Sequence, residues 1–108
     1  MPSYITNDKL LTAIYKQGTL AVELTYSEHQ TAIGNDYVTL HSARIGIYCW
    51  VNGVKGAAEV DLTDPEIRHE YSLMLEAVTH LIPFDNAEQA EAFDRANDEY
   101  YMELSHHA

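Results

Sequence analysis

The sequence has little positive charge. Its 108 residues include 6 Lys and Arg against 17 Asp and Glu, which gives a formal net charge of −11 at pH 7. A protein this negative repels the phosphates of nucleic acids and the headgroups of anionic lipids. We therefore expect no direct binding to DNA or RNA and no attachment to a membrane through basic residues.

Cysteine and long apolar runs are also scarce. The single cysteine, Cys49, cannot form an internal disulfide, and its apolar neighbours predict an inert core residue. No apolar run approaches the roughly 18 residues of a membrane span, and the first residues lack the basic and apolar segments of a secretory signal. These absences predict a cytoplasmic protein.

Catalytic motifs are missing as well. The sequence contains no GxSxG, P-loop, HExxH or CxxC pattern, so we expect no enzyme activity, no catalytic residue, no cofactor and no metal. Glu76 and His80 have a spacing that can chelate on a helix, but we interpret them as a solvated pair. Asp61, Asp64 and Glu66 are similar to part of a metal-dependent nuclease site. That alternative stays open, although a helix cap explains these residues more economically.

The length of the chain fits a single domain over residues 1–108. The helical spacing of Leu10, Ile14 and Tyr15 predicts a short helix over residues 6–17. A glycine directly after this segment is typical of a helix C-terminus. The chain is therefore expected to begin with a helix.

Residues 19–62 predict an antiparallel sheet of about four strands. Apolar and polar residues alternate from Thr19 to Tyr26, which is the pattern of a half-buried strand. Asn52-Gly53 favours a tight hairpin turn, and the weak strand formers Gly56-Ala57-Ala58 predict a bulged or edge strand after it. Strands are expected over residues 19–26, 37–41, 44–51 and 54–62.

Two acidic amphipathic helices are predicted over residues 63–104. Thr63 and Glu66 have the spacing of a capping box, and an apolar stripe continues from there to Ile82. A second helix is expected from residue 85 or 86 to residue 104, followed by a tail over residues 105–108. The predicted fold is therefore α+β, with a short N-terminal helix, an antiparallel sheet, and both C-terminal helices packed on one face of the sheet.

All the excess charge lies in the second half of the chain. Residues 1–58 hold equal numbers of acidic and basic residues, whereas residues 59–108 hold thirteen acidic residues and two arginines. On a helical wheel the carboxylates of the last helix gather on one side, where only Arg95 offsets their repulsion. Local rules are most often broken at functional sites, so this side is the candidate partner-binding surface. The expected binding residues are Glu88, Glu91, Asp94, Asp98, Glu99 and Glu103, with Glu70 on the preceding helix.

Tyr48 and Trp50 form a second candidate for partner binding. They alternate with Ile47 and Cys49 along one strand, so helices on a single face of the sheet would leave them exposed beside Arg44. Exposed aromatic residues next to an arginine are typical of interfaces. The alternative is that a further helix or a second subunit buries them, which leaves a homodimer possible.

The acidic helices over residues 63–82 and 85–104, together with the missing catalytic motifs, resemble the small inhibitors that phages encode. The resemblance is to anti-CRISPR proteins and DNA mimics as a class. It implies a stoichiometric inhibitor in the host cytoplasm that occupies the nucleic-acid-binding site of a Cas complex, or blocks its assembly. The implied partner is a basic protein surface such as that of a Cas subunit.

Three alternatives to this hypothesis remain from the sequence. An immunity protein or antitoxin that neutralises a basic toxin would need a similar acidic surface. A small metal-dependent nuclease would use the carboxylates near residue 61. An acidic face that only improves solubility would need no partner.

Overall fold

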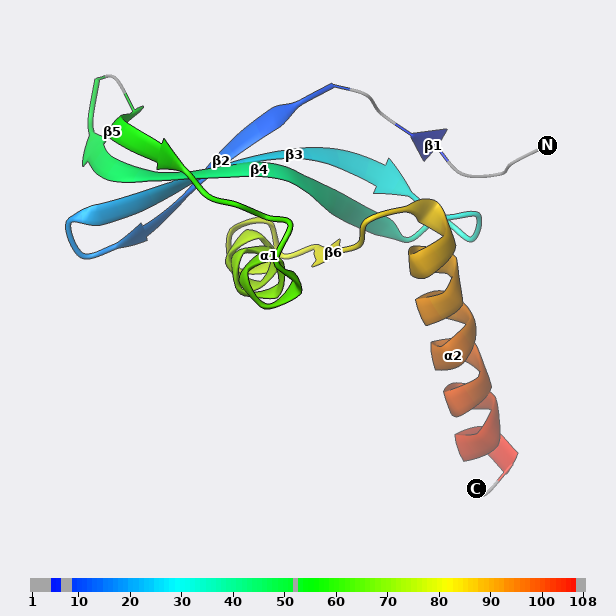
Figure 1. Cartoon of the computed structure of the whole chain (residues 1–108). Helices are drawn as coiled ribbons and strands as arrows, with labels where there is room; N and C mark the ends of the chain where they lie inside the picture. The colour runs from blue at the N-terminus through cyan, green and yellow to red at the C-terminus, as the bar shows by residue number, and fades with distance from the viewer. Residues whose placement is uncertain (1–4, 7–8, 52, 107–108) are drawn as a thin grey trace.

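The structure is a computed structural model. It describes residues 5–6, 9–51 and 53–106, and the side chains of residues 9–51 and 53–97. The described chain folds into one six-stranded sheet and two helices (Figure 1). In chain order these are β1 (Ile5–Thr6), β2 (Leu11–Gln17), β3 (Leu20–Gln30), β4 (Asp36–Cys49), β5 (Gly53–Glu59), α1 (Pro65–Thr79), β6 (Ile82–Pro83) and α2 (Ala87–His106).

The two long strands β3 and β4 form the centre of the sheet. They pair antiparallel, β1 and β2 share the free edge of β3, and β5 and β6 share the free edge of β4. Only the short β6 pairs in the parallel direction, with Ile82 opposite Tyr37. The register of β3 and β4 shifts between Thr25 and Tyr26, which makes His41 the extra residue of a β-bulge.

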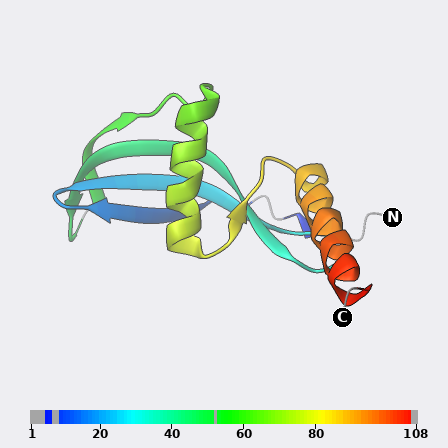
Figure 2. The ribbon, with the colours of Figure 1, turned by 90° about the horizontal axis from the view of Figure 1, so that it is seen from below.

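Helix α1 covers one face of the sheet and closes the core. Figure 2 shows it lying across the strands. Tyr71 and Leu75 on its inner face are buried against Leu24, Val38 and Leu40 from β3 and β4. Full burial of each such side chain stabilises the fold by roughly 1.5–3 kcal/mol.

Strand β5 approaches its neighbour β4 closely at Gly46. A Cβ at this position would lie 2.5 Å from the carbonyl oxygen of Lys55 and 2.6 Å from Cγ1 of Val54. The β5 register shifts opposite Gly46, and Gly56 adopts a φ of 63°, as in a β-bulge that begins with glycine. The bulge or edge strand predicted for residues 56–58 is therefore confirmed.

The predicted N-terminal helix is wrong. Residues 11–17 form β2, which pairs with β3 from Leu11 opposite Tyr26 to Gln17 opposite Leu20. Gly18 has a φ of 63° and begins the turn between the two strands. A glycine with positive φ ends a helix or turns a hairpin equally well, and pairing with β3 decides for the hairpin.

The predicted packing of both helices on one face is also wrong. Only α1 covers the sheet, whereas α2 lies beyond its end (Figure 2). The apolar stripe predicted to continue to Ile82 does not belong to one helix. Helix α1 ends at Thr79, His80 adopts a left-handed φ of 60°, and Ile82 joins the sheet in β6. This short strand turns the chain away from α1 before α2 begins.

Further details of the predicted elements differ from the structure. The two strands expected over residues 37–41 and 44–51 are one strand, β4, and β3 continues to residue 30. Asp64 rather than Thr63 caps α1, since its Oδ1 accepts from the Glu66 backbone N–H at 2.9 Å. Cys49 is half-buried at the end of β4 instead of lying in the core. Among the described residues no helix is long and apolar enough to cross a membrane.

Candidate functional site

The chain that precedes α2 is fixed by local hydrogen bonds. Asn86 Oδ1 accepts from the Gln89 backbone N–H at 2.9 Å, and Gln89 Oε1 accepts from the Asp85 backbone N–H at 3.0 Å. Arg68 on α1 donates to Asp85 Oδ1 at 2.6 Å and to the carbonyl of Leu40 at 2.9 Å. These contacts give α2 a defined starting point next to α1 and β4.

The described contacts between α2 and the rest of the molecule involve its first turns. Ala90 is only 1% exposed, and the ring of Phe93 lies 5.4 Å from that of Phe84. Asp94 Oδ1 accepts from the Asn35 side-chain amide at 3.1 Å. From there α2 extends away from the sheet (Figure 1), and its 20 residues give it a length of about 30 Å.

The acidic side of α2 begins with Glu88 and Glu91. Glu88 is exposed and Glu91 is half-exposed, and neither forms an ion pair within the described residues. Arg95 is exposed beside them, also without an ion pair among these residues. Asp94 is half-buried and touches the β3–β4 loop. The side chains of Asp98, Glu99 and Glu103, which the sequence also predicts as binding residues, lie outside the described ones.

Glu70 is the expected binding residue that lies outside α2. It is exposed on α1. Figure 1 looks along α1 but across α2, so the two helix axes run in different directions. The two helices therefore do not lie parallel, and the candidate surface developed below is that of α2.

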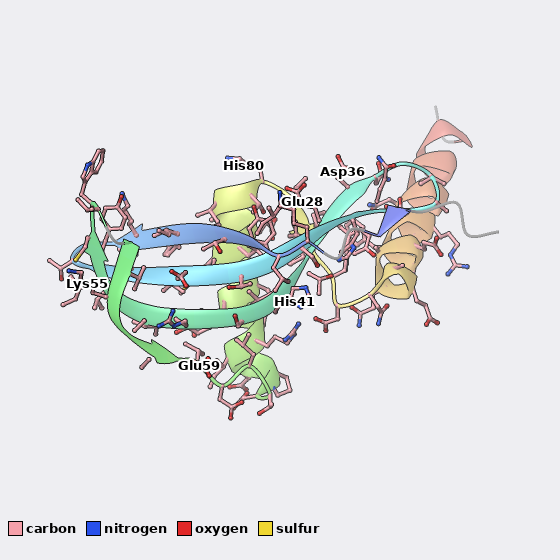
Figure 3. The ribbon with its side chains drawn as sticks, turned by 90° about the horizontal axis from the view of Figure 1, so that it is seen from above. Glu28, Asp36, His41, Lys55, Glu59 and His80 are labelled. Atoms are coloured by element: carbon pink, nitrogen blue, oxygen red, sulfur yellow. The ribbon has the colours of Figure 1, made fainter. Side chains whose placement is uncertain are left out.

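Figure 3 shows Lys55 at the far end of the sheet from α2. Tyr48 pairs with Val54 next to Lys55, and Trp50 follows in the turn after β4. Trp50 is 87% exposed, whereas Tyr48 is half-buried with Lys16 Nζ 3.8 Å from its ring centroid. The cation over the ring covers Tyr48 and leaves Trp50 as the exposed aromatic residue. The two sequence-predicted surfaces are therefore separate.

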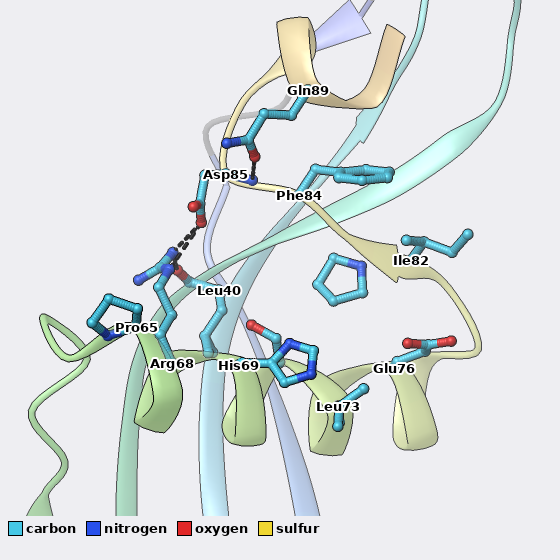
Figure 4. A pocket seen from close by; sticks show the side chains of 12 residues that line it. Leu40, Pro65, Arg68, His69, Leu73, Glu76, Ile82, Phe84, Asp85 and Gln89 are labelled. Atoms are coloured by element: carbon cyan, nitrogen blue, oxygen red, sulfur yellow. Dashed lines mark hydrogen bonds and ion pairs between the residues drawn. The ribbon is translucent and has the colours of Figure 1, made fainter. Parts of the chain in front are cut away.

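A groove separates α1 from the segment that leads to α2 (Figure 4). It has a volume of about 390 Å³, and its apolar lining includes Leu73, Ile82 and Phe84. Arg68 and Asp85 close one end of this groove through their ion pair. His69 and Glu76 line it as well, but they approach from the exposed side of α1.

A second hollow, which we call the α2-base cleft, lies where α2 meets the β3–β4 loop. Its volume is about 420 Å³. Asp36, Asp94, Tyr37, Phe84, Phe93 and His80 contribute to its lining. Sequence reasoning missed this cleft, because its residues come from three separated segments, 31–37, 80–84 and 90–97, that meet only in the folded chain. No local pattern in the sequence signals it.

Ser27, His29 and His41 form a polar cluster that sequence reasoning also missed. Ser27 Oγ lies 2.8 Å from Nε2 of both histidines, one on β3 and the other at the bulge in β4. The serine is only 2% exposed, and its hydroxyl can donate to one ring while it accepts from the other. We interpret the cluster as a link between the strands, because an enclosed and satisfied hydroxyl is poorly placed to attack a substrate.

The carboxylates considered for a nuclease or metal site serve local structure. Asp61 Oδ1 accepts from both the backbone N–H and the hydroxyl of Thr63, and these hydrogen bonds lower the pKa of Asp61. Asp64 caps α1. His80 is the left-handed C-cap residue of α1, so it and Glu76 do not have the helical spacing of a chelating pair. Within the described part of the chain, no three His, Cys, Asp or Glu residues are grouped so that they could hold a metal ion.

No protein-family model, curated protein or solved structure matches this chain. The chemistry of the surfaces described above therefore carries the functional argument. The strongest of these surfaces is α2, which projects from the body and carries Glu88 and Glu91 without ion pairs among the described residues.

Proposed function

We propose that the protein is a stoichiometric inhibitor that binds a basic protein surface through α2. The observation that carries this proposal is that α2 projects from the sheet with Glu88 and Glu91 unpaired among the described residues. A helix presented in this way can enter a groove that the body of the protein could not. Its partner is a protein that handles nucleic acid, and in the form closest to anti-CRISPR proteins it is a Cas complex.

The charge of α2 suits part of a nucleic-acid-binding site. The helix carries six carboxylates and one arginine over a length of about 30 Å. Duplex DNA carries roughly 17 phosphates over the same length, because each charge occupies about 1.7 Å of the axis. α2 therefore competes for a small group of lysines and arginines and does not replace a whole duplex.

The carboxylates serve mainly to guide and orient binding. Charges at the rim of an interface accelerate association and fix its register, whereas apolar and aromatic anchors supply most of the affinity. Phe93 is 41% exposed next to the acidic side of α2 and is such an anchor. The proposal therefore predicts binding that weakens steeply as salt is added.

The test is inhibition of DNA binding by a panel of purified Cas complexes that represents each type. Fluorescence anisotropy of labelled target DNA is measured while the full-length protein is added up to molar excess. The proposal predicts that one complex loses DNA binding at a near-equimolar ratio, and that the loss weakens at high salt. Undisturbed DNA binding by every complex contradicts the anti-CRISPR form of the proposal.

Two charge variants distinguish a specific role of the α2 carboxylates from a general effect of the net charge. In the α2-neutral variant, four carboxylates of the helix become amides: Glu88→Gln, Glu91→Gln, Asp98→Asn and Glu99→Gln. The control variant neutralises four exposed carboxylates elsewhere: Glu28→Gln, Glu59→Gln, Glu66→Gln and Glu76→Gln. Both variants change the net charge equally, so only a role of α2 itself makes them differ.

A further inference from the structure

We propose that the α2-base cleft holds the ammonium or guanidinium end of a lysine or arginine side chain from the partner. This inference rests on the proposed function, because that side chain belongs to the basic surface that α2 binds. Four observations support it: the charge of the lining, an unsatisfied carboxylate oxygen, an aromatic wall and the size of the cleft.

The described lining of the cleft is negative. It includes Asp36 and Asp94 but no lysine or arginine. The hydrogen bonds described for these carboxylates come from neutral amides, from Gln30 at 3.2 Å to Asp36 and from Asn35 at 3.1 Å to Asp94. Neutral donors leave the full negative charge in place, so the cleft attracts a cation.

Asp94 has a carboxylate oxygen that lacks a hydrogen-bond donor among the described residues. Its Oδ1 accepts from Asn35, whereas its Oδ2 is shielded from solvent and accepts no hydrogen bond within the described residues. A shielded carboxylate oxygen without a donor is costly, because it has lost hydrogen bonds to water. A positive charge held in the cleft stabilises this carboxylate through space, because no lysine or arginine lies in the described lining.

Aromatic rings form one wall of the cleft. The rings of Tyr37 and Phe84 have centroids 6.1 Å apart, and those of Phe84 and Phe93 are 5.4 Å apart. Such rings attract a cation held over their faces and also pack against the aliphatic stem of a lysine or arginine. Carboxylates and aromatic rings together are typical of sites that bind alkylammonium or guanidinium groups.

The size and position of the cleft suit a side chain of a bound partner. Its volume of about 420 Å³ exceeds the space that one lysine or arginine side chain fills. Asp94 also lines a smaller hollow of about 220 Å³ with Glu91 and Arg95, so the cleft adjoins the acidic side of α2. A partner seated along α2 can therefore insert one basic side chain into the cleft.

The test uses capped amino acids and the full-length protein, labelled with ¹⁵N. Nα-acetyl-lysine methylamide and Nα-acetyl-arginine methylamide are titrated while NMR shifts are followed, with Nα-acetyl-norleucine methylamide as the uncharged ligand of similar shape. We expect saturable shifts around Asp36, Phe93 and Asp94 with at least one charged ligand and none with norleucine. Equal binding of norleucine, or no shift with either charged ligand, overturns the inference.

Variants assign the binding to the cleft. Asp94→Asn keeps the shape of the side chain and should weaken binding by about tenfold, since it removes one of the two negative charges of the described lining. Phe93→Leu keeps an apolar residue but removes the aromatic face, and should weaken binding by about threefold. Glu59→Gln removes the same charge on β5, away from the cleft (Figure 3), and should leave binding unchanged. Circular dichroism checks that each variant is folded, and equal effects of Asp94→Asn and Glu59→Gln contradict the inference.

Failure of this inference is distinguishable from failure of the proposed function. Spermidine is titrated in parallel, and a much higher affinity for it than for the capped amino acids would assign the cleft to a free polyamine and overturn the inference. If the capped amino acids bind but no Cas complex is inhibited, the proposed function fails and the cation site remains. If a complex is inhibited and Asp94→Asn inhibits as well as the wild type, the inference fails while the proposed function remains.

Discussion

Replacement of Gly46 by alanine tests the packing of β5 against the sheet. The new Cβ would lie 2.5 Å from the Lys55 carbonyl oxygen, 2.6 Å from Val54 Cγ1 and 3.2 Å from the Cα of Ala57. Two of these three atoms belong to the backbone of β5, so a change of rotamer cannot relieve the clash. Either β5 moves away or the sheet bends at β4.

The expected loss of stability follows from two opposing effects. Overpacking of this kind costs about 1–3 kcal/mol, whereas replacement of glycine by alanine returns about 0.4–1 kcal/mol by restricting the unfolded chain. The net destabilisation is therefore about 1–2 kcal/mol, which lowers the Tm of a domain of this size by roughly 5–15 °C. Urea and thermal unfolding followed by circular dichroism measure both values.

A second substitution tests which of the two closest contacts of the new Cβ causes the loss of stability. Val54→Ala in the Gly46→Ala background removes the clash with Cγ1 but not the closer one with the Lys55 carbonyl. It should therefore fail to restore wild-type stability. A Gly46→Ala protein as stable as the wild type would refute the close approach of β5.

Three further predictions concern the core, the turn before α1 and the exposed tip of the sheet. Leu75→Ala should destabilise the fold by about 2–5 kcal/mol in urea unfolding, because Leu75 is fully buried; a loss below 1 kcal/mol would contradict its central place. Thr63→Ala removes the hydroxyl that contributes most to the lowered pKa of Asp61, so this pKa should rise toward its ordinary value of 3.8 in a carboxyl NMR titration. A lowered pKa stabilises the folded state above the ordinary pKa, so the stability advantage of the wild type over the variant should vanish as the pH falls through the folded pKa. An unchanged pKa of Asp61 in the variant would exclude the Thr63 hydroxyl as the cause. Trp50→Ser should change stability by less than about 0.5 kcal/mol, and the single tryptophan of the wild type should fluoresce as in water; blue-shifted emission would show that Trp50 is covered.

The alternation of residues predicted strands, but the same local signals could not decide every element. The pattern from Thr19 to Tyr26 coincides with β3 because one face of this strand is buried under α1 and the other is more polar. The apolar residues near Leu10 fit a helix and a strand about equally, because Leu11, Ile14 and Tyr15 are all only partly buried in β2. Pairing with β3 decided this segment, and pairing is a property of two segments at once.

The hairpin at Asn52-Gly53 was predicted correctly in kind but not in detail. β4 and β5 pair, and Gly53 has the expected positive φ of 72°. Gly53 itself pairs with Cys49, so Trp50 and Val51 belong to the hairpin loop. The exposure of Trp50 follows from this shift of the turn.

The position of α2 could not be predicted from its own sequence. An apolar stripe shows that a helix has a face to cover, but it does not say what covers that face. The parallel pairing of Ile82-Pro83 with β4 redirects the chain, and the hydrogen bond from Thr39 Oγ1 to the Phe84 carbonyl at 2.7 Å fixes the new direction. The candidate binding surface could be placed on residues 88–99 from charge alone, whereas the α2-base cleft required the three-dimensional arrangement.

The carboxylates of α2 are proposed to carry binding to a basic partner. The most direct measurement is the concentration of protein that halves DNA binding by the inhibited Cas complex, compared between the α2-neutral variant and the control variant at one ionic strength. Four charge pairs at about 0.2–1 kcal/mol each predict that the α2-neutral variant needs from about fourfold to several hundredfold more protein, and that the control variant differs from the wild type by less than about twofold. Equal half-maximal concentrations for the two variants would contradict the account.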